Sequence, residues 1–186
     1  MLTYDAPVDE MRFLLEAFGY GRVADLETFS EFDIETVEMM LEQAGRFYSE
    51  VVLPTNPVGD RQGVSWDPDT YEVATPDGFR EAWQKISENG YVGMTTPREY
   101  GGSGAPYSLG TLLSEIAVAT NKSLAIGGLS GGLTMALLAN GTDEQKETYI
   151  PKFATGEWTA AMDLTEPQAG TDLGLIRTSA EPEDGI

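Results

Sequence analysis

Residues 164–172 read Leu164-Thr165-Glu166-Pro167-Gln168-Ala169-Gly170-Thr171-Asp172, and this stretch carries more information than any other in the chain. Pro167 and Gly170 are typical of a tight loop, and the residues before them predict that it follows a strand. Successive backbone N–H groups in such a loop can form a concave donor surface that suits an anion. The hydroxyls of Thr165 and Thr171 add further donors. A plain β-turn with satisfied hydroxyls explains the same pattern, and composition names no ligand.

Upstream of this loop, apolar residues recur at helical spacing in several segments. The sequence predicts helices over residues 7–18, 33–51, 77–89, 107–120, 123–139 and 142–156. Asp33 and Asp77 are expected to cap two of them, and Thr142 opens another with a capping box. The segment 123–139 is apolar on every side, which predicts a buried helix.

Prolines are expected to end the second of these helices. Pro54 and Pro57 follow its last apolar position, and a proline inside a helix removes one backbone hydrogen bond. Residues 55–75, which contain further Gly and Pro, are therefore expected to form a long loop.

From residue 157 onward the pattern changes, because residues 158–164 and 173–180 look extended. The sequence therefore predicts a mainly α fold, in which a helical domain precedes the first strands of a β domain. The chain stops at Asp184-Gly185-Ile186, one turn further on. Because two strands without partners are marginally stable, we expect this ending to be a truncation.

Composition excludes several classes of function. The 186 residues include no Cys and no His, so disulfides, thiol nucleophiles, Ser–His pairs and imidazole or thiolate metal sites are excluded. No EF-hand spacing occurs either, so no metal site is expected. The net charge of −20 makes nucleic acid a poor partner. With no long apolar run and no secretory start, we expect a cytoplasmic protein without a membrane span.

The loop 164–172 resembles the first signature of the acyl-CoA dehydrogenases, in which Thr-Glu-Pro is followed by Ala-Gly, Ser or Thr, and Asp. Flanking segments resemble the same family at the usual spacing: Asn89-Gly-Tyr-Val-Gly93, Tyr100-Gly-Gly-Ser-Gly104, Gly141-Thr-Asp-Glu-Gln-Lys146, Tyr149-Ile-Pro-Lys152 and Gly156-Glu157. The resemblance covers about residues 34–180. Residues 4–14 are similar to the amino-terminal extension of a bacterial subgroup that acts on longer or unusual acyl chains.

This resemblance implies a domain organisation. Residues 1–33 would form the extension, and residues 34–156 the all-α amino-terminal domain, which is an up-and-down, bundle-like domain. Residues 157–186 would begin the middle domain, a β-barrel that is truncated here. The sequence departs from the family pattern at Asp163 and Leu175, where small residues are usual.

The resemblance also implies FAD as the cofactor. The backbone of Met162 and Leu164 and both ends of Thr165 would contact the flavin ring. Gly170 and Thr171 would lie at the pyrophosphate, and Thr171 would also reach the CoA portion of the substrate. None of these roles follows from composition.

The glycine-rich stretch Gly127-Gly-Leu-Ser-Gly-Gly132 lacks the Lys-Ser/Thr of a phosphate loop and the spacing of a dinucleotide fingerprint. Small residues four apart are typical of close helix packing. The resemblance implies a second role for the same helix, in which Ala125, Gly128, Leu129 and Gly132 line the tunnel for the acyl chain. Both interpretations stay open.

The reaction implied by the family is αβ-dehydrogenation of an acyl-CoA thioester, a step of fatty acid metabolism. An electron-transfer flavoprotein is the implied acceptor, and the full-length enzyme is expected to be a homo-oligomer. In the family the base is a Glu of the carboxy-terminal helical domain, so no catalytic residue is assigned to this chain, which we expect to be inactive alone. Two alternatives remain: an acyl-CoA oxidase or flavin monooxygenase of the same fold, and a non-catalytic helical interaction module.

Overall fold

The structure, a computed structural model, describes residues 2–181, apart from the side chains of Gly128 and Leu129. The chain's ending Asp184-Gly185-Ile186 lies outside the described residues. The mainly α prediction is confirmed. The α-helices are α1 (Val8–Ala17), α2 (Gly21–Ala24), α3 (Ile34–Phe47), α4 (Asn56–Gln62), α5 (Phe79–Glu88), α6 (Tyr107–Ala125), α7 (Ser130–Asn140) and α8 (Asp143–Ala154). Short 3-10 helices lie at η1 (Glu27–Phe29), η4 (Arg98–Tyr100) and η5 (Ile126–Leu129).

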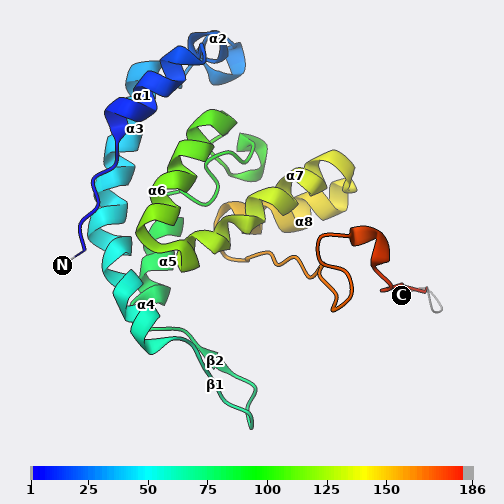
Figure 1. The fold of residues 1–186 in the computed structure, drawn as a ribbon. Coiled ribbons are helices and arrows are strands. Elements are labelled where there is room, and N and C mark those ends of the chain that lie inside the picture. The colour runs from blue at the N-terminus through cyan, green and yellow to red at the C-terminus, as the bar shows by residue number, and fades with distance from the viewer. Residues whose placement is uncertain (1, 182–186) are drawn as a thin grey trace.

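Several of the helices pack around a shared core. In Figure 1, α1 lies along α3 on one side, α6 occupies the middle, and α7 lies beside α8 on the other side. Buried apolar side chains of α1, α3, α5 and α6 form a single cluster, in which Val37, Leu41, Leu109 and Ile116 are completely buried. This core holds α6 in place between α3 and α5.

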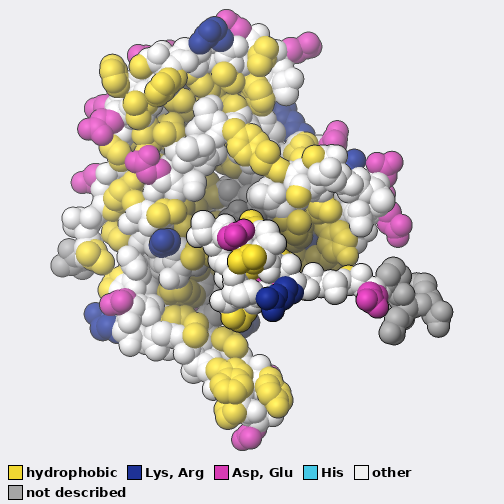
Figure 2. All heavy atoms as spheres, turned by 45° about the vertical axis from the view of Figure 1, so that its right-hand side comes forward, with side chains coloured by type: hydrophobic (Ala, Val, Ile, Leu, Met, Phe, Trp, Pro, Cys, Tyr) yellow, Lys and Arg dark blue, Asp and Glu magenta, His cyan; other side chains and the backbone are white. Residues whose placement is uncertain are grey.

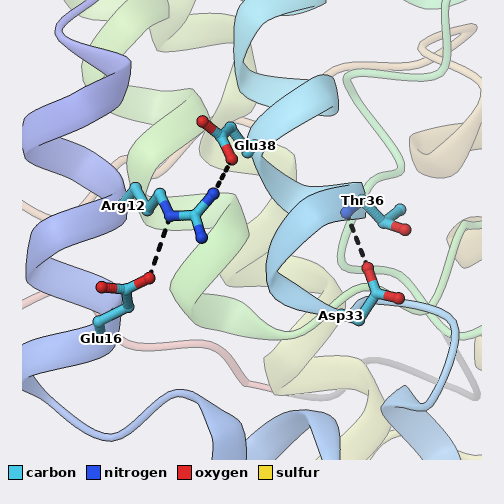
Figure 3. Close-up of polar contacts among 5 residues, drawn as sticks. All are labelled: Arg12, Glu16, Asp33, Thr36 and Glu38. Atoms are coloured by element: carbon cyan, nitrogen blue, oxygen red, sulfur yellow. Dashed lines mark hydrogen bonds and ion pairs between the residues drawn. The ribbon is translucent and has the colours of Figure 1, made fainter.

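The amino-terminal segment is fixed on α3 by polar and close contacts. Arg12 of α1 bonds both Glu16, at 3.0 Å, and Glu38 of α3 (Figure 3). The Ser49 hydroxyl donates to the Tyr4 carbonyl at 2.6 Å. A Cβ atom added to Gly45 would lie 2.7 Å from the Cβ of Ala6, so glycine is needed for this close approach.

Asp33 caps α3 as predicted, because its carboxylate accepts the Thr36 N–H at 2.7 Å (Figure 3). The prediction that Pro54 and Pro57 end this helix is wrong. The chain continues through a π-helical turn η2 (Tyr48–Val52) and a 3-10 turn η3 (Leu53–Thr55) into α4. Each proline lies at the first or second position of a new helical segment, where its missing N–H costs no hydrogen bond.

The predicted loop over residues 55–75 is therefore helical in its first part, and its second part is a hairpin. Strands β1 (Ser65–Trp66) and β2 (Val73–Ala74) pair antiparallel, with Trp66 opposite Val73. The hairpin projects from the helices at the bottom of Figure 1. Its apolar side chains are visible there in Figure 2, together with an apolar area at the opposite end where α1 and α2 lie.

The prediction that Asp77 caps α5 is also wrong. The residue before α5 is Gly78, whose φ of +79° is left-handed, and no side chain caps this helix. The backbone N–H of Asp77 instead donates to Gln62 Oε1 at 3.1 Å. The end of α5 at Asn89-Gly90 agrees with the prediction, and Thr142 and Gln145 form the predicted capping box of α8.

Helix α6 runs past its predicted end at Thr120 but breaks at Asn121, whose φ of −156° and ψ of 98° are not helical. The prediction that residues 123–139 form one buried helix is wrong. The 3-10 turn η5 interrupts the segment, and Ile126, Leu133 and Met135 are 52%, 40% and 50% exposed. Within residues 2–181, no single helix is long and apolar enough to cross a membrane. Helices α6 and α7 combine sufficient length and apolar character only as a pair, bent by 96°.

The strands predicted over residues 158–164 and 173–180 are not formed in the structure. Residues 157–181 contain one isolated bridge, between Glu166 and Ala169, and a 3-10 turn η6 (Leu173–Leu175). A strand needs a partner for its backbone groups, and the described residues supply none beside these segments.

Candidate functional site

The loop 164–172 has a fixed inner part and a free outer part. Glu166 and Ala169 exchange both backbone hydrogen bonds, at 3.1 and 3.0 Å, and Ala169 is completely buried. The N–H groups of Gly170 and Thr171 have no hydrogen-bond partner among residues 2–181, and both residues are exposed. The loop therefore presents donors to solvent, as an anion-binding loop requires.

The lead-in segment is equally open. Met162 is 74% and Leu164 39% exposed, and their backbone groups bond to no other described residue. Thr165 is exposed, and its hydroxyl and that of Thr171 also lack a partner within residues 2–181. The five residues that the resemblance assigned to the cofactor are thus all exposed.

The carboxylate of Glu166 holds the loop to a later segment. It accepts the N–H of Arg177 at 3.0 Å, the N–H of Thr178 at 2.8 Å and the hydroxyl of Thr178. Gln168 Nε2 also donates to it. The Thr178 hydroxyl, followed by these two N–H groups, lowers the pKa of Glu166 to about 2. A base for a weakly acidic carbon needs a raised pKa, so Glu166 is unsuited to that role.

A cavity of about 160 Å³ lies between α5, α6 and the start of α7. Its walls include Tyr48, Trp83, Tyr91, Leu113, Ala125 and Gly131, and no charged side chain contributes to them. Burial raises the pKa of both Tyr48 and Tyr91, so both phenols stay neutral at physiological pH. Such a cavity suits an uncharged, apolar group.

The residues assigned to the acyl chain are only partly brought together. Ala125 lines the cavity, whereas Gly132 is exposed and lies outside it, and its neighbour Gly131 takes part instead. Gly128 and Leu129 lie in η5, and their side chains are outside the described part of the structure.

Trp83 closes one side of this cavity through two contacts. A Cβ atom on Gly127 would lie 2.4 Å from Cζ3 of the indole, so the ring packs directly on that backbone. The indole Nε1 donates to the Gly156 carbonyl at 3.1 Å, which joins α5 to the segment that leads into the loop.

Ser130 is a further site residue that the sequence did not single out. It is 2% exposed, its hydroxyl donates to the Gly127 carbonyl at 3.2 Å, and it accepts the N–H of Ala160 at 3.2 Å. The first residue of α7 is thereby bonded to the segment before Met162. In the sequence, the signal that could have pointed to Ser130 is a hydroxyl residue within a run of glycines.

The chain is similar in sequence to known proteins. The sequence profile of the acyl-CoA dehydrogenase N-terminal domain matches residues 34–157. The chain is 35% identical to 3-methylmercaptopropionyl-CoA dehydrogenase of Ruegeria pomeroyi, over 98% of this chain and 31% of that protein. The chain thus spans less than a third of the length of this relative.

Solved structures show the same similarity. An acyl-CoA dehydrogenase from Geobacillus kaustophilus aligns with a TM-score of 0.64 and 28% identity, over 78% of this chain and 35% of that one. An acyl-CoA dehydrogenase complexed with FAD, from Bacillus anthracis, aligns with a TM-score of 0.59 and 28% identity, over 77% and 22%.

Proposed function

This chain belongs to the acyl-CoA dehydrogenase family, and we propose that it supplies the helical domain and the flavin loop of an FAD-dependent enzyme that dehydrogenates acyl-CoA thioesters between Cα and Cβ. The observation that carries this proposal is the loop after Met162. Its family motif coincides with N–H groups at Gly170 and Thr171 that are unpaired among residues 2–181.

The described residues fit the cofactor. The unpaired N–H groups of Gly170 and Thr171 would bind the pyrophosphate, because oriented amides stabilise anions even in a chain with a net charge of −20. The backbone of Met162 and Leu164 and the hydroxyl of Thr165 would hold the flavin ring. When bound, FAD supplies the acceptor for the hydride that leaves the substrate β-carbon.

The substrate would lie between this loop and the cavity. Thr171 would contact the CoA portion, and Ala125, with its cavity-lining neighbour Gly131, would lie along the acyl chain. An apolar cavity of roughly 150 Å³ holds a benzene-sized molecule, so a space of about 160 Å³ suits a short acyl group. The similarity to an enzyme named for 3-methylmercaptopropionyl-CoA supports the same size of substrate.

The remaining parts of the reaction are proposed to lie outside this chain. The base is expected on a carboxy-terminal helical domain, so the 186 residues alone should show no turnover. We further propose an electron-transfer flavoprotein as the electron acceptor, a homo-oligomeric full-length enzyme and a cytoplasmic location.

The test uses the full-length protein with added FAD. Acyl-CoA thioesters of increasing length, together with a short thioether acyl-CoA, are assayed for reduction of an artificial electron acceptor and for release of hydrogen peroxide. The proposal expects acceptor reduction with the short thioesters and little peroxide. Peroxide as the main product would assign the chain to the oxidase alternative, and failure to bind FAD would support the non-catalytic alternative.

A further inference from the structure

One side chain, Glu166, makes most of the hydrogen bonds that link the two ends of the flavin loop. Residues 175–178 are joined to residues 164–169 by the Glu166 carboxylate and by one long contact, in which Gln168 Nε2 donates to the Leu175 carbonyl at 3.4 Å. The other hydrogen bonds described in residues 166–178 are local turns, such as the bond from Leu175 N–H to the Asp172 carbonyl. Glu166 therefore closes the loop.

The chemistry of this closure requires an ionised carboxylate. The groups that face it are all donors: two adjacent backbone N–H groups, the Thr178 hydroxyl and the Gln168 amide. Only a side chain without a proton of its own can accept from all four, and charge-assisted bonds are about twice as strong as neutral ones. A glutamine of the same size would direct an NH₂ group at other donors.

The same closure determines which N–H groups stay free. Between the two closed points, Ala169 is buried and paired with Glu166, whereas the N–H groups of Gly170 and Thr171 remain unpaired among the described residues. Ordering a loop before a ligand arrives removes part of the entropic cost of binding.

We propose that Glu166 is a positioning residue: its carboxylate holds the loop 166–178 closed before the nucleotide binds, so that Gly170 and Thr171 offer their N–H groups in one fixed arrangement. The identity of the nucleotide rests on the proposed function, whereas the closure of the loop does not. Glu166 itself does not touch the reacting atoms.

The test compares four single variants of the full-length protein, of which Glu166→Asp is the conservative one. Glu166→Gln keeps the size of the side chain but not the charge, Thr178→Val removes one donor, and Glu157→Gln is the control. Glu157 is an exposed carboxylate just before the loop and is bonded to Lys152 at 2.7 Å. Melting temperatures are expected to be equal, because the loop packs outside the helical core.

Two measurements separate closure from ligand binding. In the FAD-free protein, hydrogen exchange of the Arg177 and Thr178 amides should be about tenfold faster in Glu166→Gln, since these amides lose a charged acceptor. The Kd for FAD should rise by about tenfold, because the loop must then be ordered on binding. Glu166→Asp, which keeps the charge on a shorter side chain, should recover part of both effects, and Glu157→Gln should show neither.

The contrary outcomes are distinct. Unchanged exchange in Glu166→Gln would show that the carboxylate does not close the loop. Faster exchange with an unchanged Kd would show that closure plays no part in positioning the nucleotide. Absence of FAD binding by the unaltered protein would overturn the proposed function and the claim that closure positions the nucleotide. The hydrogen exchange rates of the Arg177 and Thr178 amides would still decide whether Glu166 closes the loop.

Discussion

The hydroxyl of Ser130 accepts a hydrogen bond from the backbone N–H of Ala160 at 3.2 Å, and this bond connects the first residue of α7 to the segment that precedes the loop 164–172. The residues in between form the rest of α7 and all of α8. This buried hydroxyl and the bond from the Trp83 indole to the Gly156 carbonyl thus both join the helices to the segment before the loop.

Replacement of Ser130 by Ala should destabilise the protein by about 1–2 kcal/mol, because the partly buried N–H of Ala160 loses its acceptor. Urea unfolding measures this loss. Ser30→Ala is the control, since the exposed Ser30 hydroxyl bonds only to the nearby Glu27 carbonyl, and it should change stability by less than about 0.5 kcal/mol. Equal losses of unfolding free energy in the two variants would show that the bond from Ala160 to Ser130 stabilises the protein no more than an exposed hydroxyl contact does.

Asn121 should be among the most sensitive polar positions. It is 1% exposed, its amide donates to Thr55 Oγ1 at 2.8 Å, and its carbonyl oxygen accepts the N–H groups of Ser123 and Leu124. It thereby joins α6 to η3 and caps the part of α6 beyond its break. Asn121→Ala should cost roughly 2–3 kcal/mol by thermal unfolding. Asn140→Ala, at an exposed helix end, should cost far less, and a similar loss at both positions would contradict this assignment.

The size of the cavity should limit the acyl group. Ala125→Leu would fill part of the space of about 160 Å³ and should lower kcat/KM for the longer thioesters by about tenfold relative to the shortest. Ala136→Leu is a matched control on the exposed surface of α7. A uniform fall with every thioester would indicate a folding or cofactor effect in place of selection by size.

Protonation of Glu166 should release the loop at low pH. Its pKa in the folded state is lowered to about 2, below the value of about 4.3 expected in an unfolded chain. The closure is therefore fully present above about pH 4.3 and is lost as the pH falls through about 2. The amide proton shift of Thr178, followed by NMR, should titrate with a midpoint near 2. A midpoint near 4.3 would show that the carboxylate is free.

Local sequence signals predicted many helix boundaries but not how the chain passes between helices. Asp33 and Thr142 cap their helices as their side chains suggest, because such caps need only nearby N–H groups. Pro54 does not end its helix, since the π-helical turn before it allows a new segment to begin there. Whether a helix ends or restarts at a proline depends on tertiary packing, here on buried Val52 and Thr55.

The candidate site was predictable where it depends on a short motif and not where it depends on distant contacts. The motif identified the loop from Thr165 to Thr171, whose free amides the structure describes. The bonds of Ser130 to Ala160 and of Glu166 to Thr178 join residues 30 and 12 positions apart, and no periodicity reports such pairs. The strands expected after residue 157 depend on partners beyond their own sequence.

The most direct test is a crystal structure of the full-length protein with FAD bound. The account predicts that the N–H groups of Gly170 and Thr171 donate to the pyrophosphate oxygens and that Thr165 contacts the flavin ring. A nucleotide bound elsewhere, or a loop whose Gly170 and Thr171 amides are bonded to the protein itself, would contradict it.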